Sequence, residues 1–347
     1  MLEAADTSDG MNGATNGTMT ISTASADLID KQKLAVTVSR IHDEADGIRS
    51  FELRSADGRA LPPFTAGSHV EVHLPTGVIR SYSLCSDPQR HDHYVISVLR
   101  EAAGRGGSSY MHDHVSVGDQ LVIAAPRNHF PLAGREARFH LMLAGGIGVT
   151  PMIAMIAELE RRGARWQLHY CTRNPQRTAF MAQLQPYVDA GKVVLHHDEG
   201  DPTRGLDIKT TLAEFEIGTH LYFCGPPGFM QACGACLEPW PPHAVHREFF
   251  AGSGTGLDQE GNEAFEIKLR RSGTVLAVPA DKSIVDVLKL NGCDVETDCN
   301  EGYCGTCITR YLAGAPEHRD TVLSDKERKS YVMVCCARAK GLLELDL

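Results

Sequence analysis

The 347-residue sequence lacks any long run of apolar residues, and it lacks an excess of positive charge. No stretch approaches the roughly 20 apolar residues that a membrane-spanning helix needs, so the sequence predicts no membrane span. The formal net charge is −10 at pH 7. Because an acidic chain offers no basic face for phosphates, we expect no nucleic-acid partner.

The N-terminus also lacks the features of a signal peptide. Residues 1–32 are rich in Ala, Ser, Thr, Asp and Gly, with neither a basic start nor an apolar core. This composition predicts a disordered tail. Without a secretory signal we expect a cytoplasmic location, where the eleven cysteines would serve metal or redox chemistry rather than disulfides.

The first half of the remaining chain changes its pattern once. Residues 33–134 contain short alternating apolar and polar runs separated by turn residues, which predicts a small β-barrel. Residues 135–250 alternate strands with helices, and this order predicts a parallel sheet covered on both faces. In this region the sequence predicts a strand over 138–144, a helix from Pro151 and another helix over 178–190.

A second change of pattern marks a third unit. Residues 251–263 begin with glycine alternating with small residues, which is typical of a linker. Residues 264–347 begin with a hairpin pattern, followed by a short helix that Ser283 caps and Gly292 ends. The chain is therefore predicted to be a multidomain protein of three units.

The third unit holds a crowded set of cysteines. Cys299, Cys304 and Cys307 have the spacing C-x4-C-x2-C, and Cys335 and Cys336 follow at a distance. This is the ligand spacing of a plant-type [2Fe–2S] cluster, whereas structural zinc usually takes two separated C-x2-C pairs. The spacing therefore favours a [2Fe–2S] cluster.

Only one of Cys335 and Cys336 can complete this ligand set. Residues 331–336 are predicted to form a strand, on which adjacent side chains point to opposite faces. We expect one thiol to face the cluster and the other to pack as a small apolar side chain. Gly302 and Gly305 should let the ligand loop wrap closely, with backbone N–H groups facing the sulfurs.

One strand of the first unit points to a flavin. It carries Arg80, Ser81, Tyr82 and Ser83 in succession. The Tyr82 ring can lie against an isoalloxazine ring, Arg80 can face a phosphate and Ser83 can hydrogen-bond the edge of the ring. An ordinary strand with an exposed arginine fits the same residues.

A glycine run strengthens the flavin interpretation. Gly106, Gly107 and Ser108 precede a predicted helix, so their backbone donors can form an anion site at its N-terminus. Read alone, the run also fits a flexible loop.

The second unit offers a place for a dinucleotide. Gly145, Gly146, Gly148 and Thr150 link a strand to a helix, and Pro151 stands where a G-x-G-x-x-G motif would have its third glycine. Proline is favourable in a first helical turn, and the helix N-terminus can face a pyrophosphate.

The next strand of this unit ends where an adenosine ribose would lie. Thr172 and Arg173 follow it. Arg173 or Arg177 can meet a 2′-phosphate, which would favour NADPH, or both can be solvated.

Two further strand ends complete the candidate site. Cys224 and Gly225 end one strand, and Glu248 lies close to Phe249 and Phe250 at the end of the unit. Cys224 can equally be a buried strand thiol, and the pattern does not decide which phenylalanine approaches a flavin.

In this order, the motifs resemble those of the phthalate dioxygenase reductase and vanillate O-demethylase reductase family. The resemblance covers residues 34–347. It implies a flavin β-barrel, an α/β nucleotide-binding domain and a β-grasp ferredoxin domain. It also implies FMN rather than FAD, and NADH rather than NADPH.

The resemblance implies roles for single residues as well. It assigns the fourth iron ligand to Cys335 and places Cys224 beside the nicotinamide. It places an aromatic residue and a carboxylate near the flavin, for which we take Phe250 and Glu248. With these residues, Ser83 is expected to act at the reacting rings.

The implied function is that of an NADH-dependent reductase component of a Rieske-type oxygenase or O-demethylase. Electrons would pass from NADH to FMN, to the [2Fe–2S] cluster and to a terminal oxygenase. This oxygenase must be a separate polypeptide, because the chain lacks the C-x-H and C-x-x-H pair of a Rieske centre. We expect a monomer. The alternatives are a reductase for a haem-thiolate monooxygenase or general acceptor, and a redox-sensing regulator.

Overall fold

The computed structural model describes residues 33–101, 104, 106–250, 261–297, 300, 302, 304–320 and 322–347. The predicted tail, residues 251–260 of the predicted linker and the predicted iron ligand Cys299 lie outside the described residues. Across the part of the chain that the structure describes, no helix has both the length and the apolar character needed to span a membrane.

The first unit is an antiparallel barrel. Its strands follow the order β4-β3-β6-β1-β2-β5, with β7 paired to β3. A bridge between Leu84, just after β4, and Ile96 on β5 joins the two ends of this order. The elements are β1 (Lys33–Ala45), β2 (Ile48–Ser55), β3 (Ser68–His73), β4 (Ile79–Ser83), β5 (Tyr94–Leu99), α2 (Gly107–His114), β6 (Gln120–Ala124) and β7 (Arg127–Asn128).

The second unit is a five-stranded parallel sheet in the order β10-β9-β8-β11-β12. Alternate residues serve its two faces, as the period of a strand requires. Met142 and Ala144 pack toward the barrel, whereas Leu141 and Leu143 belong to a separate core with α5 and α6. The predicted parallel sheet with covered faces is confirmed.

The strands of this unit are β8 (Phe139–Gly145), β9 (Trp166–Thr172), β10 (Val193–His197), β11 (Thr219–Cys224) and β12 (Val245–Glu248). Its helices are η1 (Gly146–Val149), α3 (Thr150–Arg162), η2 (Pro175–Arg177), α4 (Met181–Asp189), η3 (Pro202–Arg204), α5 (Ile208–Ala213), α6 (Pro227–Gly234) and η4 (Pro242–Ala244). Helix α4 begins three residues later than predicted, because Phe180 has a left-handed backbone with φ of 63°.

The third unit is a mixed sheet with its own core. The strand order is β14-β13-β19-β15-β17, and only the β13–β19 pair is parallel among these neighbours. Ser283 caps α7 through reciprocal hydrogen bonds with Asp286, as the sequence predicts for this helix start. The elements are β13 (Phe265–Leu269), β14 (Val275–Val278), α7 (Ile284–Leu290), β15 (Ile308–Ala313), β16 (Pro316–Glu317), η5 (Glu327–Lys329), β17 (Tyr331–Met333), β18 (Arg338–Ala339) and β19 (Leu342–Leu345).

The strand predicted over 331–336 is wrong in its second half. Strand β17 ends at Met333, and the Met333 carbonyl oxygen accepts hydrogen bonds from the N–H groups of Cys336 and Ala337. A carbonyl engaged in this way closes a turn. Cys335 and Cys336 therefore lie on a turn, and the rule of opposite strand faces does not apply to them.

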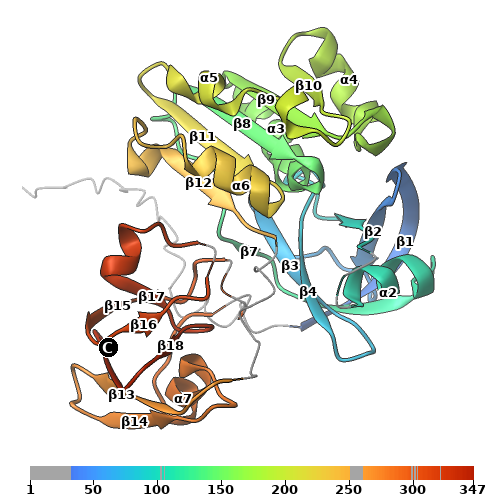
Figure 1. Cartoon of the computed structure of the whole chain (residues 1–347). Helices are drawn as coiled ribbons and strands as arrows, with labels where there is room; N and C mark the ends of the chain where they lie inside the picture. Colours follow the sequence, from blue (N-terminus) through green and yellow to red (C-terminus); the bar gives the residue numbers. More distant parts are fainter. Residues whose placement is uncertain are drawn as a thin grey trace, which may run out of the picture.

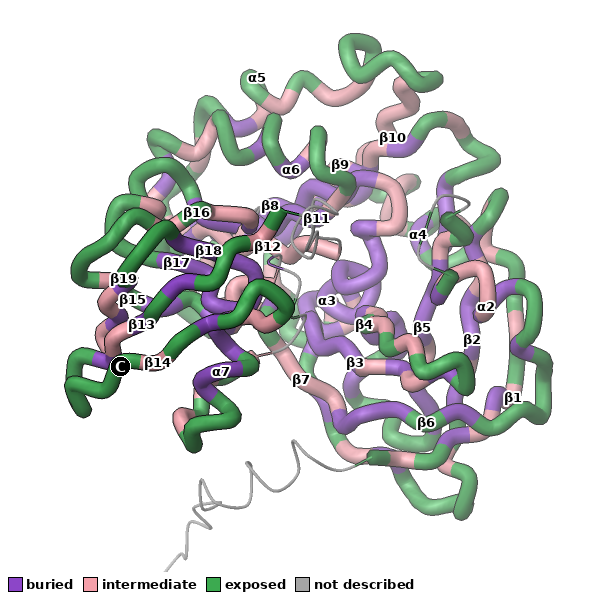
Figure 2. Tube along the Cα trace, turned by 60° about the horizontal axis from the view of Figure 1, so that its bottom comes forward, coloured by how far each residue is buried: buried purple, intermediate pink, exposed green. Residues whose placement is uncertain are grey.

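The three units are not equally joined. One continuous core contains the barrel, helix α3 and helix α4, whereas the third unit has a core of its own. Figure 1 shows the third unit lying below the β11–β12 end of the parallel sheet and beside β7. Figure 2 shows the buried strands gathered within each unit. The barrel and the nucleotide-binding unit thus form one body.

Neutral histidines lie buried or half-buried along the parallel sheet. The rings of His140 and His246 both stack on Tyr222, with centroid distances of 5.8 Å and 4.4 Å. His169 forms a hydrogen bond of 3.0 Å with His196. Burial lowers the pKa of His140, His169 and His246 from 6.5 to about 4.

We therefore predict that acidification destabilises the fold between pH 6.5 and about 4. In this window the unfolded chain binds protons at these histidines while the folded chain keeps them neutral, so stability is lost as the pH falls. Thermal unfolding from about pH 8 to about pH 5 should show a falling midpoint. The His140→Phe variant should weaken this dependence, and His91→Phe at an exposed loop position should not. A midpoint that stays level would contradict the prediction.

Candidate functional site

The glycines of the predicted nucleotide loop allow backbones to meet at the carboxyl edge of the parallel sheet. A Cβ atom on Gly148 would lie 2.2 Å from the Cys224 carbonyl oxygen, and one on Gly225 would lie 3.0 Å from the Gly145 Cα atom. Gly146 has a φ of 54°, in the left-handed region. Only residues without a side chain fit these positions.

The loop passes directly into helix α3. The Thr150 hydroxyl donates to the Ile147 carbonyl at 3.0 Å and closes the turn, and Pro151 lies in the first turn of the helix. The start of α3 therefore lies at the sheet edge next to the Cys224 strand end, where the sequence predicts a pyrophosphate.

A carboxylate and a hydroxyl meet where the barrel touches this edge. Cys224 and Glu248 are partners in the register of β11 and β12. The Ser83 hydroxyl, at the end of β4, donates to Glu248 Oε2 at 3.2 Å. The structure thus brings together the three residues expected at the reacting rings.

Cys224 is a neutral thiol in this environment. It is fully buried, and burial together with the nearby Glu248 carboxylate raises its pKa well above the ordinary value. A thiol in this state does not supply a thiolate nucleophile. It can form an uncharged wall beside an apolar ring.

A cavity opens beside the Ser83–Glu248 hydrogen bond. Its walls come from the barrel and from the end of the nucleotide-binding unit, and they include His69, Ser81, Ser83, His129, Glu248, Phe249 and Phe250. Phe250 packs against the barrel core, whereas Phe249 packs against the cores of the other two units. The two adjacent phenylalanines therefore pack against different cores, and Phe250 is the one that joins the core shared by the barrel and helix α3.

His69 and His129 were not predicted from the sequence. His69 lies on β3 and His129 follows β7, and their rings lie 5.5 Å apart. The two residues are far apart in the sequence, so no local motif contains both. They come together only because β3 pairs with β7. The pairing of strands across the barrel is the only signal that could have identified them.

The arginine and the glycine run of the flavin prediction meet at the start of α2. A Cβ atom on Gly107 would lie 2.7 Å from Arg80 Cγ and 3.0 Å from Arg80 Nε. Gly106 precedes the helix with a φ of 82°, and the Ser108 hydroxyl accepts a hydrogen bond from Glu101 N–H at 3.1 Å. A guanidinium group beside helix N–H groups fits a phosphate monoester.

Tyr82 lies on a different face of β4 from Ser81 and Ser83, as strand alternation requires. It packs against the barrel core, and burial raises its pKa to about 12. It is not among the residues that line the cavity. The stacking of Tyr82 on a flavin therefore stays a prediction.

The end of β9 offers little support for the predicted ribose site. The Thr172 hydroxyl is engaged with the Thr178 hydroxyl at 2.8 Å, which points to a structural role in holding the following turn. Arg173 is exposed beyond the strand. The contacts of Thr172 and Arg173 with an adenosine ribose therefore stay a prediction.

The predicted iron ligands outside Cys299 gather around a left-handed loop. Asn300, Gly302 and Gly305 have φ values of 52°, 77° and 86°. Hydrogen bonds from the Cys307 thiol and the Gly302 N–H group favour the thiolate of Cys335, whereas Cys336 and burial oppose it, and the pKa of Cys335 is raised overall. A backbone donor aimed at a sulfur stabilises a thiolate, as the sequence analysis expects of this loop.

The thiols of Cys304, Cys307 and Cys335 are placed where a metal cluster could bind their sulfurs. The hydrogen bond with Cys335, followed by burial, raises the pKa of Cys307 above its ordinary value, and Cys304 lies nearby. Several thiolates so close together would repel one another, and metal ions remove this repulsion by binding the deprotonated sulfurs. Among the described residues no three such side chains converge on a single ion, but a two-iron cluster needs only two thiolates at each iron.

Cys336 also lies against this loop. A Cβ atom on Gly302 would lie 2.6 Å from Cys336 Sγ, and the Cys335 thiol is hydrogen-bonded to Cys336. Both cysteines are buried in the core of the third unit, so the expectation that one of them packs as a small apolar side chain stays a prediction, but the strand geometry on which it was based is wrong. The cause is the turn that replaces the predicted strand.

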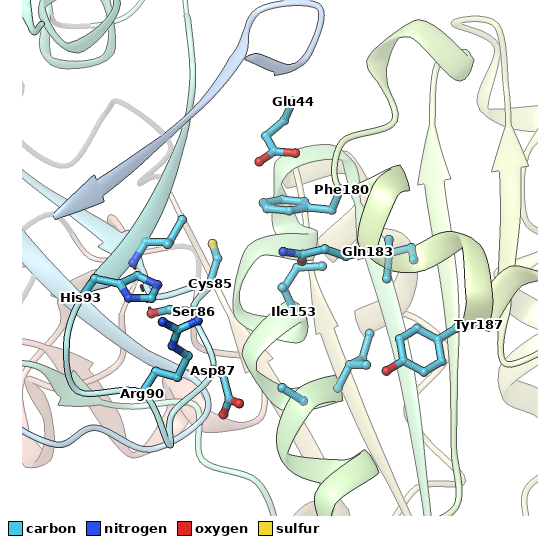
Figure 3. Close-up of a pocket in the computed structure, with 14 residues that line it drawn as sticks. Glu44, Cys85, Ser86, Asp87, Arg90, His93, Ile153, Phe180, Gln183 and Tyr187 are labelled. Carbon is cyan, nitrogen blue, oxygen red and sulfur yellow. Dashed lines mark hydrogen bonds between the residues drawn. The ribbon is translucent and has the colours of Figure 1, made fainter. Parts of the chain in front are cut away.

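A larger cavity, of about 350 Å³, lies between the barrel and helices α3 and α4. Figure 3 shows Ser86 and Arg90 on one side of it and Gln183 and Tyr187 on the other. None of the predicted cofactor residues lines this cavity. The predicted site is the smaller cavity at Ser83 and Glu248.

We predict that Gly148→Ala disrupts the nucleotide loop. The new Cβ atom would meet backbone 2.2 Å away, and overpacking of this kind costs about 1–3 kcal/mol of unfolding free energy. Chemical denaturation should show this loss, and NADH should bind more weakly. The control is Gly228→Ala, which places its Cβ atom in open space. Equal behaviour of the two variants would contradict the prediction.

We also predict that Cys335→Ser removes the metal centre whereas Cys336→Ala keeps it. The Gly302 N–H group is directed at Cys335, and this donor favours the thiolate form that iron requires. Iron and acid-labile sulfide should be counted in both purified variants, together with their visible spectra. Retention of iron by Cys335→Ser and its loss from Cys336→Ala would reverse the assignment.

Comparison with known proteins places this geometry in a family. Residues 142–234 match the oxidoreductase NAD-binding domain model, and residues 267–340 match the 2Fe-2S iron-sulfur cluster binding domain model. Vanillate O-demethylase oxidoreductase of Pseudomonas putida is 44% identical, over 90% of this chain and 99% of that protein. Phthalate dioxygenase reductase of Burkholderia cepacia is 41% identical, over 87% and 94%.

A solved structure agrees with these relatives. The structure of phthalate dioxygenase reductase, described as modular for electron transfer from pyridine nucleotides to [2Fe-2S], has a TM-score of 0.68 and 39% identity to this chain. The match covers 94% of this chain and 100% of that chain. The expected fold class, of flavin barrel, α/β nucleotide-binding domain and ferredoxin domain, is confirmed. The chain therefore belongs to the phthalate dioxygenase reductase and vanillate O-demethylase reductase family.

Proposed function

We propose that this protein is the NADH-dependent reductase component of a Rieske-type oxygenase or O-demethylase. The observation that carries the proposal is the cavity at Ser83 and Glu248, which the barrel and the nucleotide-binding unit line and whose wall residue His129 contacts Thr306 of the third unit. Relatives that are reductases of such systems match over nearly the whole chain. The terminal oxygenase is a separate polypeptide.

In this function the cofactors supply the electron chemistry: NADH gives a hydride, FMN accepts two electrons and releases them singly, and the [2Fe–2S] cluster carries one electron onward. The chain supplies position and electrostatics. Arg80 with the start of α2 would hold the FMN phosphate, and the start of α3 would hold the pyrophosphate of NADH.

Residues around the cavity would orient the reacting rings. The Ser83 hydroxyl and the Glu248 carboxylate lie at one wall, so both can hydrogen-bond a polar ring edge. Phe250 would exclude water, and the neutral Cys224 thiol would sit against the nicotinamide without adding charge. Cys299, Cys304, Cys307 and Cys335 would hold the two irons.

Other expectations belong to the same proposal. We place the domain boundaries at residues 134, 250 and 263 and take the protein to be a monomer. None of the ten cysteines in the described ranges forms a disulfide, which fits the reducing cytoplasm. The alternatives, a haem-thiolate monooxygenase reductase and a redox-sensing regulator, are not better supported than the oxygenase reductase, because the curated relatives named above are reductases of oxygenase or O-demethylase systems.

An anaerobic NADH titration tests the proposal. FMN accepts two electrons and the cluster one, so about 1.5 equivalents of NADH should reduce both. The visible spectrum should report the flavin, and EPR should report the reduced cluster. Steady-state reduction of cytochrome c by NADH should follow, which a regulator without turnover would not support. Colourless protein, or protein holding zinc, would overturn the proposal.

A further inference from the structure

Three contacts between described residues join the third unit to the rest of the molecule. The Arg247 guanidinium lies 3.7 Å from the Glu327 carboxylate and 5.9 Å from the centre of the Phe249 ring. The Phe249 ring packs against the core of the third unit. A hydrogen bond of 3.3 Å joins the Thr306 hydroxyl to His129 Nδ1.

The contact at His129 differs from the others in its position. His129 is a wall of the Ser83–Glu248 cavity, whereas Thr306 lies between the two predicted iron ligands Cys304 and Cys307. The same imidazole therefore faces the cavity and contacts the ligand loop. The distance between His129 and Thr306 therefore helps to set the distance between the flavin cavity and the iron–sulfur loop.

The backbone on both sides of His129 is held in place by hydrogen bonds and packing. On one side, Asn128 Nδ2 donates to Thr65 Oγ1 at 2.6 Å and to the Ala66 carbonyl at 2.9 Å. On the other side, the Phe130 N–H group donates to Asn128 Oδ1 at 2.9 Å, and Phe130 is buried. A Cβ atom on Gly67 would lie 1.9 Å from the Phe130 carbonyl oxygen, so backbone packs on backbone behind this loop.

We propose that the His129–Thr306 hydrogen bond docks the iron–sulfur loop at the flavin cavity, and that Thr306 and His129 are positioning residues for electron transfer between the two centres. The inference rests on the proposed function. The core of the third unit is separate, and small inter-domain contacts permit relative motion. Loss of this hydrogen bond therefore widens the gap that single electrons must cross, while hydride transfer from NADH to the flavin is left unchanged.

The test compares Thr306→Val with Thr306→Ser in the intact holoprotein. Valine keeps the shape of threonine but removes the hydroxyl, and serine keeps the hydroxyl. Stopped-flow mixing with NADH should show flavin reduction at the wild-type rate in both variants. The subsequent cluster reduction should slow by about two- to tenfold in Thr306→Val only, the range that one hydrogen bond provides.

Hydrogen exchange supplies a readout that does not depend on turnover. In the oxidised protein, Thr306→Val should raise amide exchange in both segments that meet, residues 128–130 and 304–308. Iron content and the visible spectrum of the cluster should match the wild type, which would show that the ligands are intact. Thr211→Val serves as the matched control, because it removes a threonine hydrogen bond within α5, away from this contact.

A second substitution keeps the inference testable if the ligand loop tolerates valine poorly. His129→Phe retains a ring in the cavity wall, and combining it with Thr306→Val should add little further slowing, because both remove the same hydrogen bond.

Cluster reduction and exchange at wild-type values in Thr306→Val would overturn the inference. If the wild-type cluster were never reduced by NADH, the proposed function would fail instead, and the exchange comparison would still decide whether Thr306 docks the loop.

Discussion

The packing of helix α3 against the flavin barrel is the constraint on which the rest of the site depends. Residues of α3 such as Met152 and Met155 share one continuous core with barrel residues. A Cβ atom on Gly67 of the barrel would lie 3.1 Å from Met155 Cε. Because close-packed interiors resist shear, this core fixes where β4 ends relative to β12. The Ser83–Glu248 hydrogen bond, and with it the cavity, follow from that fixed relation.

The third unit obeys a different constraint. It has its own core and its own helix cap, and among the described residues it contacts Phe249, Arg247 and His129 of the other units. Such an arrangement suits a protein that must bring a cluster close to a flavin and also deliver electrons to a separate oxygenase. The barrel and the nucleotide-binding unit share one core, which would hold the nicotinamide and the flavin in a fixed geometry for hydride transfer. The third unit makes fewer contacts, so part of its surface would be open to the next electron acceptor.

Much of this architecture could be predicted from the sequence, because the informative residues act locally. The Ser283 cap and Pro151 at the start of α3 each depend on neighbouring residues, and each describes what the structure shows. The C-x4-C-x2-C spacing is local as well, and it lies within the residues that match the 2Fe-2S iron-sulfur cluster binding domain model. The approach of Gly107 to Arg80 joins two motifs that the sequence identifies separately.

What could not be predicted depends on contacts between distant segments. His69 and His129 have no motif, and only the β3–β7 pairing brings them to the cavity. The turn after Met333 overrides a segment with a strand-like pattern and brings Cys336 to the ligand loop. The left-handed Phe180 delays α4 in the same way. In each case tertiary contacts or turn hydrogen bonds outweigh local propensity.

A crystal structure of the holoprotein would test the central claim most directly, because it would locate the flavin. The account predicts the isoalloxazine ring in the cavity at Ser83, Glu248 and Phe250, with its phosphate at Arg80 and the iron–sulfur loop against His129. A flavin in the larger cavity at Glu44, Phe180 and Tyr187, or a cluster loop remote from His129, would contradict it.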